Sequence, residues 1–259
     1  YHDLFGDLRW KPTARDQFSL MGINSRDQLA YHEGWFDSDG DGDLDPPGSR
    51  GDLDPPEINS DLPYDPNNWV DTSFARVRAR WDHTGDKHTH STWAAVGPEQ
   101  QQNLLGAWWL SREGPYRGRV KGVTTVVRRD DSWRFGEHAV LAGAQFTYRP
   151  VTATDYADVL DNTDQNATIT TDTQTRFGIW IEPQFQVGEW YIGEGSRTAA
   201  YWWSDRTSLQ YEPRVSVRKQ LSEYWKAKAG VGHYSQMPAI ERYVQGIGNP
   251  NLPETTAWQ

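Results

Sequence analysis

The sequence has no cysteine among its 259 residues and no long apolar run. Without cysteine the fold uses no disulfide staple, which fits an oxidising compartment without requiring one. No stretch approaches the roughly 18 to 20 apolar residues that a membrane-spanning helix needs. If the chain crosses a membrane, it does so as strands of roughly 9 to 11 residues, each apolar on one face only.

Signals for secretion, catalysis and nucleic-acid binding are missing as well. The first ten residues are polar and lack the positive and apolar regions of a signal peptide, so we expect an internal piece of a longer protein. There is no G-x-S-x-G motif, glycine-rich phosphate loop or H-E-x-x-H motif, so we expect no enzyme. The net charge of −10, with no clustered Lys/Arg face, argues against nucleic acid as a partner.

Strict alternation is the strongest pattern that is present. Residues 75–81 read Ala-Arg-Val-Arg-Ala-Arg-Trp, so apolar side chains occupy the odd positions and arginines the even ones. On a strand this order places one charged row opposite one apolar row. The three arginines must meet water, which either an exposed sheet face or a water-filled lumen provides.

Five further segments alternate in the same way and predict strands. They are residues 117–129, with Val120, Gly122, Thr124 and Val126 on the apolar side, and residues 138–148, 177–185, 211–219 and 224–234. Short connections are expected at 83–87, 130–133 and 221–223, and long ones at 37–68, 98–116, 150–174 and 238–255. Short turns at one end and long loops at the other are typical of outer-membrane barrels, whereas soluble sandwiches have mostly short connections.

Aromatic residues make up 13% of the chain, including 14 tryptophans and 12 tyrosines, and many stand near the ends of the predicted strands. Amphipathic rings gather at membrane–water interfaces, which accounts for that placement. Sugar-binding or core aromatics of a soluble β-protein account for it equally well.

An acidic segment fits the D-x-D-x-D-G-x-x-D template of a calcium loop, with Asp37, Asp39, Asp41, Asp43 and Asp45 at alternate positions. Alternate carboxylates can converge on one hard cation, and Gly42 permits the sharp turn. The EF-hand version fails because Gly48 stands where a bidentate Glu is required. Two interpretations stay open: a loop ordered by Ca²⁺, and a solvated acidic loop that binds nothing tightly.

Three histidines, His83, His88 and His90, surround one predicted turn. His88 and His90 share a strand face because they are two residues apart. A metal site would need a third ligand, and the neighbouring sequence supplies none, so a polar turn is the simpler interpretation.

Residues 213–254 carry a dense family pattern, PRVSVRKQLSEYWKAKAGVGHYSQMPAIERYVQGIGNPNLPE. Two alternating strands joined by a tight turn lead into a polar loop that ends in N-P-N-L-P-E. This order resembles the barrel of TonB-dependent outer-membrane receptors, which carry a similar hairpin followed by an N-P-x-L-x-P-E segment. Residues 136–143 (GEHAVLAG) and 8–12 (LRWKP) are similar to further pieces of that barrel.

The resemblance implies an all-β fold, an antiparallel up-and-down meander of roughly ten strands that forms part of a barrel of roughly 22. Residues 1–259 would be part of this barrel, with an acidic extracellular loop at 37–68 and without the plug domain or TonB box. The implied function is TonB-powered import of a siderophore, cobalamin or glycan across a bacterial outer membrane.

The implied partners are outer-membrane lipid, the TonB complex and a small extracellular ligand. Among loop residues we expect Trp108, Trp109 and Tyr243 to contribute to ligand capture, together with the acidic cluster of the 37–68 loop. Two rival functions remain, a passive porin and a secreted calcium-dependent β-rich protein that binds or processes glycans. The secreted protein would need apolar residues on the inner faces of two packed sheets, which the row of arginines at 76, 78 and 80 argues against.

Overall fold

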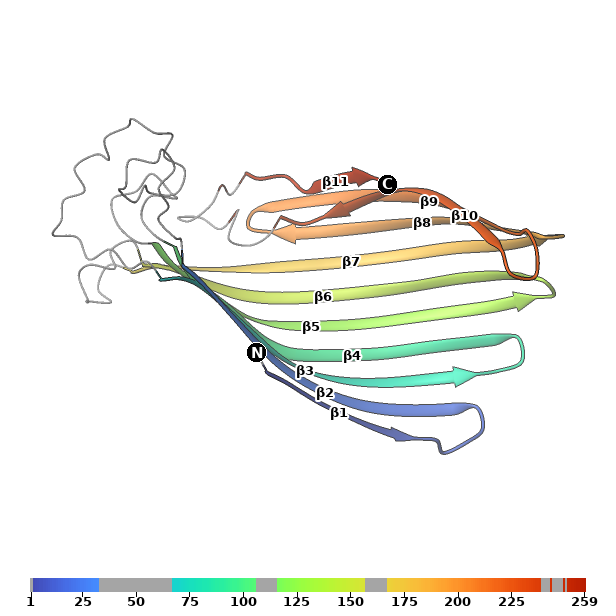
Figure 1. Cartoon of the computed structure of the whole chain (residues 1–259), viewed down its shortest axis with the longest axis horizontal. Coiled ribbons are helices and arrows are strands. Elements are labelled where there is room, and N and C mark those ends of the chain that lie inside the picture. The colour runs from blue at the N-terminus through green and yellow to red at the C-terminus, as the bar shows by residue number, and fades with distance from the viewer. Residues whose placement is uncertain are drawn as a thin grey trace, which may run out of the picture.

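The computed structural model describes residues 2–32, 67–105, 116–156, 167–238, 243, 249 and 251–259. These residues form one open antiparallel sheet of eleven strands, which follow one another in chain order (Figure 1). The strands are β1 (His2–Trp10), β2 (Asp16–His32), β3 (Asn67–Thr84), β4 (His88–Leu105), β5 (Tyr116–Phe135), β6 (His138–Tyr156), β7 (Ala167–Val187), β8 (Trp190–Trp203), β9 (Arg206–Gln220), β10 (Lys226–Gln236) and β11 (Thr255–Trp258). The predicted all-β meander is confirmed, and no helix in the described residues is long and apolar enough to span a bilayer.

The connections differ between the two ends of the sheet. At one end, which we call the turn end, strands are joined by residues 11–15, 85–87, 136–137, 188–189 and 221–225. At the other, the loop end, the connections are 33–66, 106–115, 157–166 and 237–254, with one exception, the two-residue turn of Ser204 and Asp205 between β8 and β9. The predicted asymmetry is therefore confirmed, apart from this one tight turn.

Two predictions about the connections are wrong. Residues 130–133 belong to β5, and the turn lies at Gly136–Glu137, where Gly136 has a φ of 64°. The acidic pair Asp130 and Asp131 is typical of a turn. In the structure Arg128 forms an ion pair with Asp130 and Arg129 forms one with Asp131, and both aspartates stay in the strand. The expected long loops are also shorter than predicted, because 67–68, 98–105, 150–156 and 167–174 are strand.

One face of the sheet is apolar over nine strands. Directly paired residues form a continuous row, Leu8, Leu20, Ala79, Ala94, Val127, Phe146, Phe177, Ala200 and Leu209. The larger side chains of this row are 41% to 71% exposed, so no second layer of described residues covers them. A continuous apolar surface of this extent requires a non-aqueous neighbour.

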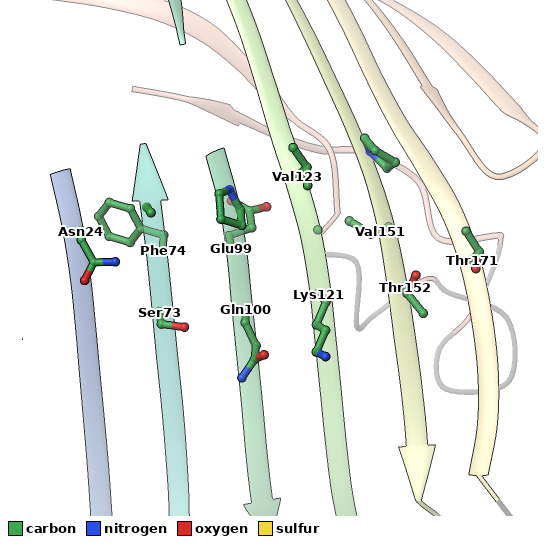
Figure 2. A pocket seen from close by; sticks show the side chains of 14 residues that line it. Asn24, Ser73, Phe74, Glu99, Gln100, Lys121, Val123, Val151, Thr152 and Thr171 are labelled. Carbon is green, nitrogen blue, oxygen red and sulfur yellow. The ribbon is translucent and has the colours of Figure 1, made fainter. Parts of the chain in front are cut away.

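The apolar face ends in polar residues toward the loop end (Figure 2). The row there is Ser73, Gln100, Lys121, Thr152 and Thr171, again directly paired from strand to strand. These residues line a hollow of about 620 Å³ together with Asn24 and Val123. On β3 to β7 the apolar surface is thus a band that ends before the loop end of the strands.

The opposite, charged face carries the residues of the other parity, including Arg76, Arg78 and Arg80. One predicted side is wrong here: Val120, Gly122, Thr124 and Val126 lie on the charged face. Val127 pairs with Phe146 in the apolar row, so the odd-numbered residues of β5 face that way. Because residues 117–129 have valines at both parities, only the register with neighbouring strands could decide between the two sides.

A small core covers the charged face near the loop end. It consists of Val151, Ala153, Ala199, Tyr201, Trp203 and Tyr243, all at most 2% exposed. Five of these residues come from β6 and β8, whereas Tyr243 comes from the connection between β10 and β11. Tyr243, which belongs to the family pattern of residues 213–254, therefore packs onto the charged face.

Candidate functional site

Arginines from β3, β5, β6, β7, β8 and β9 line the charged face and form the candidate site. Alternation places them on one face, and the antiparallel register places them side by side; they are Arg76, Arg78, Arg80, Arg128, Arg149, Arg176, Arg197, Arg214 and Arg218. Among the described side chains of β3–β9 they outnumber the acids of the same face, which are Asp82, Glu99, Asp130, Asp172, Glu182 and Glu212. We call this set the arginine wall.

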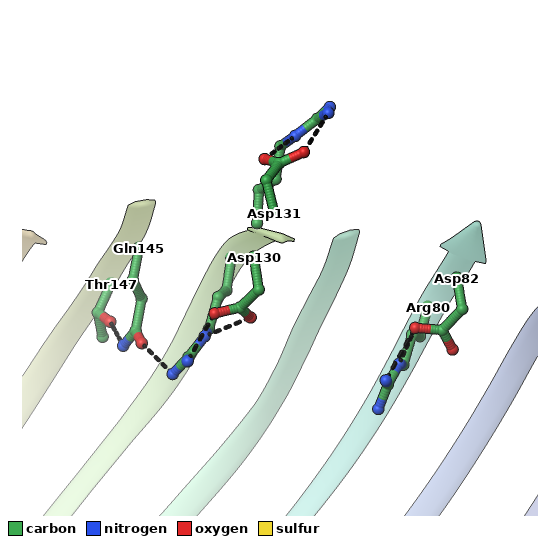
Figure 3. Close-up of polar contacts among 8 residues, drawn as sticks. Arg80, Asp82, Asp130, Asp131, Gln145 and Thr147 are labelled. Carbon is green, nitrogen blue, oxygen red and sulfur yellow. Dashed lines mark hydrogen bonds and ion pairs between the residues drawn. The ribbon is translucent and has the colours of Figure 1, made fainter. Parts of the chain in front are cut away.

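Short ion pairs hold part of the arginine wall (Figure 3). Arg80 lies 2.8 Å from Asp82, and Arg128 donates to both oxygens of Asp130 at 2.8 Å, each pair two residues apart on one strand. Arg128 also lies 3.4 Å from the amide oxygen of Gln145. Carboxylate partners fix these guanidinium groups in place without removing all of the positive charge of the wall.

Glu99 on β4 forms ion pairs with two arginines, one on β3 and one on β6. Arg76 on β3 lies 2.6 Å from one oxygen of Glu99 on β4, and Arg149 on β6 contacts the other oxygen. Arg149 also donates to the amide oxygen of Gln174 at 2.8 Å. One carboxylate shared by two guanidinium groups leaves a net positive charge at this point of the wall.

Aromatic rings hold the arginines at the middle of the wall. The guanidinium carbon of Arg128 lies 4.6 Å from the ring centre of Trp180, and that of Arg197 lies 5.9 Å from the same ring. Arg176 lies 5.2 Å from the ring of Tyr201. Cation–π contacts of this kind orient a cation without neutralising its charge.

Several arginines keep donor groups unused. The Nε atoms of Arg78, Arg176, Arg197 and Arg214 are buried and have no hydrogen-bond partner among the described residues. An unsatisfied buried donor costs about 1–3 kcal/mol, more for charged groups. A face with surplus positive charge and spare donors attracts anions and raises their local concentration.

The segment between β10 and β11 is bound to the same face. Gln174 donates to the backbone oxygen of Pro238 at 3.4 Å, and the Ser208 hydroxyl donates to Glu254 at 2.9 Å. Arg206 donates to the backbone oxygen of Asn251. Several polar contacts therefore fasten both ends of the segment to the charged face.

Of the residues predicted to capture a ligand, only Tyr243 lies within the described part of the chain. It is fully buried in the small core, and burial raises the pKa of its phenol well above the usual value. Trp108 and Trp109 lie outside the described residues, and so do the predicted calcium ligands Asp37, Asp39, Asp41, Asp43 and Asp45. Their roles stay predictions.

The histidine cluster gains the third ligand that the sequence did not reveal. The possible ligand atoms of His88, His90 and Asp131 all lie within 4.8 Å of one another. Asp131 comes from β5, where it pairs directly with His90. Only the register of β4 against β5 brings together residues that lie so far apart along the chain, so sequence spacing could not have found this ligand.

Comparison with solved structures identifies the fold. The ferripyoverdine receptor of the Pseudomonas aeruginosa outer membrane matches with a TM-score of 0.61 at 12% identity, over 92% of this chain and 36% of the receptor. The ferric citrate transporter FecA matches with a TM-score of 0.62 at 13% identity, over 90% of this chain and 35% of the transporter. No family model matches the chain, and no curated protein matches it by sequence.

A third similar structure, the copper transporter OprC, matches with a TM-score of 0.59 at 12% identity, over 93% of this chain and 38% of OprC. All three are TonB-dependent receptors and transporters and not enzymes. The chain spans about a third of the length of each. The resemblance found in the sequence is confirmed at the level of fold: this chain has the fold of part of the barrel of TonB-dependent receptors.

Proposed function

We propose that this chain forms part of the barrel of a TonB-dependent outer-membrane transporter that imports a small anionic ligand. The observation that carries this proposal is the arginine wall, which stands opposite a continuous apolar face. In a membrane barrel the apolar face contacts lipid and the other face lines the lumen. A lumen lined with surplus guanidinium groups favours the passage of anions over that of neutral or cationic solutes.

The ends of the sheet suggest its orientation in the membrane. Outer-membrane barrels have short periplasmic turns and longer extracellular loops, so the turn end would face the periplasm. The strands β1 and β11 are each paired on one side only among the described residues. An open edge in lipid leaves backbone groups unsatisfied, so the transporter would close its barrel with further strands and contact TonB through parts beyond this sheet.

Among siderophore, cobalamin and glycan ligands, the arginine wall favours a negatively charged metal–siderophore chelate. Capture would begin at the loop end, with Trp108 and Trp109 as aromatic contacts and the 37–45 acidic cluster as a Ca²⁺-ordered loop. Tyr243 is buried against the wall, so it would contact a ligand only after the segment between β10 and β11 moves. Each of these capture roles is part of the proposal.

The test is uptake of radioactive ferric chelates by cells that produce the intact transporter. We expect the double variant Arg128→Gln and Arg197→Gln to reduce uptake of an anionic chelate roughly 10-fold or more, because field focusing typically changes such rates by about 10- to 1,000-fold. The matched control is Arg119→Gln, on β5 but on the other face, where Arg119 contacts Gln100. Heat-modifiable migration on gels checks that every variant is folded.

Three results would contradict the proposal. Equal uptake by the double variant and the wild type would remove the role of the arginine wall. Uptake that persists in cells without TonB would favour the passive porin instead. Loss of uptake with Arg119→Gln as large as with the double variant would point to general damage to the barrel.

A further inference from the structure

A polar patch interrupts the apolar face near the turn end. One directly paired row there consists of Asp16, His83, His90 and Asp131. His88 lies two residues before His90 on the same strand and shares its face. Charged groups on a lipid-facing wall destabilise a barrel: Arg and Lys cost about 0–1 kcal/mol near the interface and about 2–4 kcal/mol at mid-depth, and Asp and Glu cost less. Such groups commonly mark a functional site.

Three of these side chains converge on one point. The Nε2 atom of His88 lies 2.9 Å from an oxygen of Asp131, and the ligand atoms of His88, His90 and Asp131 all lie within 4.8 Å of one another. Zinc–ligand bonds are about 2.0–2.2 Å long, so ligand atoms on one ion lie roughly 3–4 Å apart. Small side-chain rotations would bring all three onto a single ion.

His90 has a further feature that indicates a missing ligand. Both of its ring nitrogens are buried, and neither has a hydrogen-bond partner among the described residues. A neutral imidazole has one N–H donor and one acceptor nitrogen, and leaving a buried group unpaired costs about 1–3 kcal/mol. The ring of Trp81 packs edge-on against His90 at 4.4 Å and covers it without offering either nitrogen a partner. A metal ion would use the acceptor nitrogen.

We propose that His88, His90 and Asp131 bind one divalent transition-metal ion of the Zn²⁺ type. Two imidazole nitrogens and one carboxylate oxygen suit Zn²⁺, whereas Ca²⁺ and Mg²⁺ prefer oxygen ligands throughout. Three protein ligands leave a position for water or a fourth group. The ion would join β4 to β5 near the turn end.

The surroundings of the three ligands support this assignment. Arg129 donates to both oxygens of Asp131, at 2.7 and 2.9 Å, and so orients the carboxylate. A carboxylate has about four lone-pair sites, so Asp131 can keep Arg129 and still bind an ion. His83 stacks on His90 at 5.3 Å and is itself held by Asp16 at 2.8 Å. Partners of this kind fix ligand orientation in known metal sites.

This site is separate from the proposed transport path. His88, His90 and Asp131 lie on the apolar face, and the arginine wall lies on the other side of the same strands. The ion would therefore be a resident of the barrel wall and not the transported cargo. A result that contradicts the metal site therefore leaves the transport proposal standing, and the reverse also holds.

The test is Co²⁺ and Zn²⁺ binding to the intact protein in detergent after treatment with a chelator. We expect one equivalent of Co²⁺ with visible absorption bands from nitrogen and oxygen ligands, displaced by Zn²⁺. The single variants His88→Gln and His90→Gln should each weaken binding about 100-fold or more, because loss of even an outer-shell partner costs about 10- to 100-fold. The more conservative variant Asp131→Asn should also weaken it.

The matched control is His138→Gln. His138 lies on the same face near the turn end, where it contacts the ring of Phe185 and belongs to no group of three possible ligands among the described residues. This variant should keep the wild-type affinity, and heat-modifiable migration should show that all variants are folded. Absence of saturable Co²⁺ binding, an unchanged equivalent in the double variant His88→Gln and His90→Gln, or equal loss with His138→Gln would each overturn the site.

Discussion

Gly97 allows the most direct test of the sheet geometry. A Cβ atom added at Gly97 on β4 would overlap the backbone oxygen of Ala75 on β3 and lie 2.9 Å from the Cα of Arg76. The three nearest atoms that it would meet all belong to backbone, so no movement of a flexible side chain relieves the overlap. We therefore expect the substitution Gly97→Ala to force two neighbouring strands apart.

The local pairing explains why a glycine stands at this position. The ladder between β3 and β4 pairs Phe74 with Glu99 and Val77 with Val96, and the two pairs between them are missing. Pro98 has no N–H group to donate to the ladder, which loosens the pairing at this point. The Arg76 guanidinium instead lies 3.4 Å from the backbone oxygen of Gly97. The two backbones thus come close where the regular hydrogen bonds stop.

Overpacking in a closely packed region typically costs about 1–3 kcal/mol. Alanine is favoured over glycine in a strand by roughly 0.5–1 kcal/mol, which offsets part of this cost. We expect Gly97→Ala to lower the free energy of unfolding by about 1–2 kcal/mol. The matched control is Gly22→Ala on β2, where an added Cβ would meet nothing within 4 Å. The control should be neutral or slightly stabilising.

The assay is urea unfolding of the intact protein in lipid vesicles, followed by tryptophan fluorescence and heat-modifiable migration. Comparing the two variants removes the effect of glycine on the unfolded chain, since both replace glycine with alanine in a strand. Equal unfolding midpoints for Gly97→Ala and Gly22→Ala would refute the close approach of β3 and β4.

Three further predictions concern the faces, the core and the acidic loop. Phe177→Lys should destabilise the membrane-inserted barrel by about 2–4 kcal/mol, whereas Thr147→Lys on the charged face should change stability little; similar losses in vesicle unfolding would contradict the face assignment. Burial raises the pKa of Tyr243, so the folded state keeps a proton that the unfolded state loses above about pH 10, and stability should fall as the pH rises further. Tyr243→Phe should flatten this alkaline fall, and an unchanged pH profile would contradict it. Calorimetric titration should show Ca²⁺ binding that Asp39→Asn together with Asp41→Asn abolishes, and a wild-type protein that takes up no Ca²⁺ would contradict the calcium loop.

Strand identity and the side of most side chains could be predicted from the sequence. The alternation at 75–81, 138–148, 177–185 and 211–219 placed apolar residues such as Phe146 and Phe177 on the face where the structure has them. A period of two is a local property, because each strand residue points opposite to its neighbour whatever lies alongside. The overall meander was implied by the resemblance to the receptor barrels, and the short connections agree with it because they join antiparallel neighbours.

The errors occurred where local pattern was ambiguous. In residues 117–129 apolar residues stand at both parities, and pairing with β6 decided which face Val127 shares. Asp130 and Asp131 read as a turn because acidic pairs are common there, yet ion pairs with Arg128 and Arg129 keep them in β5. The polar ends of the strands were predicted as loops because they lie beyond the apolar band and so lack the alternation of apolar and polar residues.

The sequence by itself determined that this protein is an antiparallel sheet with one apolar and one charged face, since that information is written in neighbouring residues. Only the tertiary structure decided which distant residues meet. It brought Arg128 and Arg197 to one tryptophan, Tyr243 into the core on the charged face, and Asp131 beside His90. The reason is physical: the register between strands depends on the summed pairing of whole strands, and a shift of one residue would move every side chain to the other face.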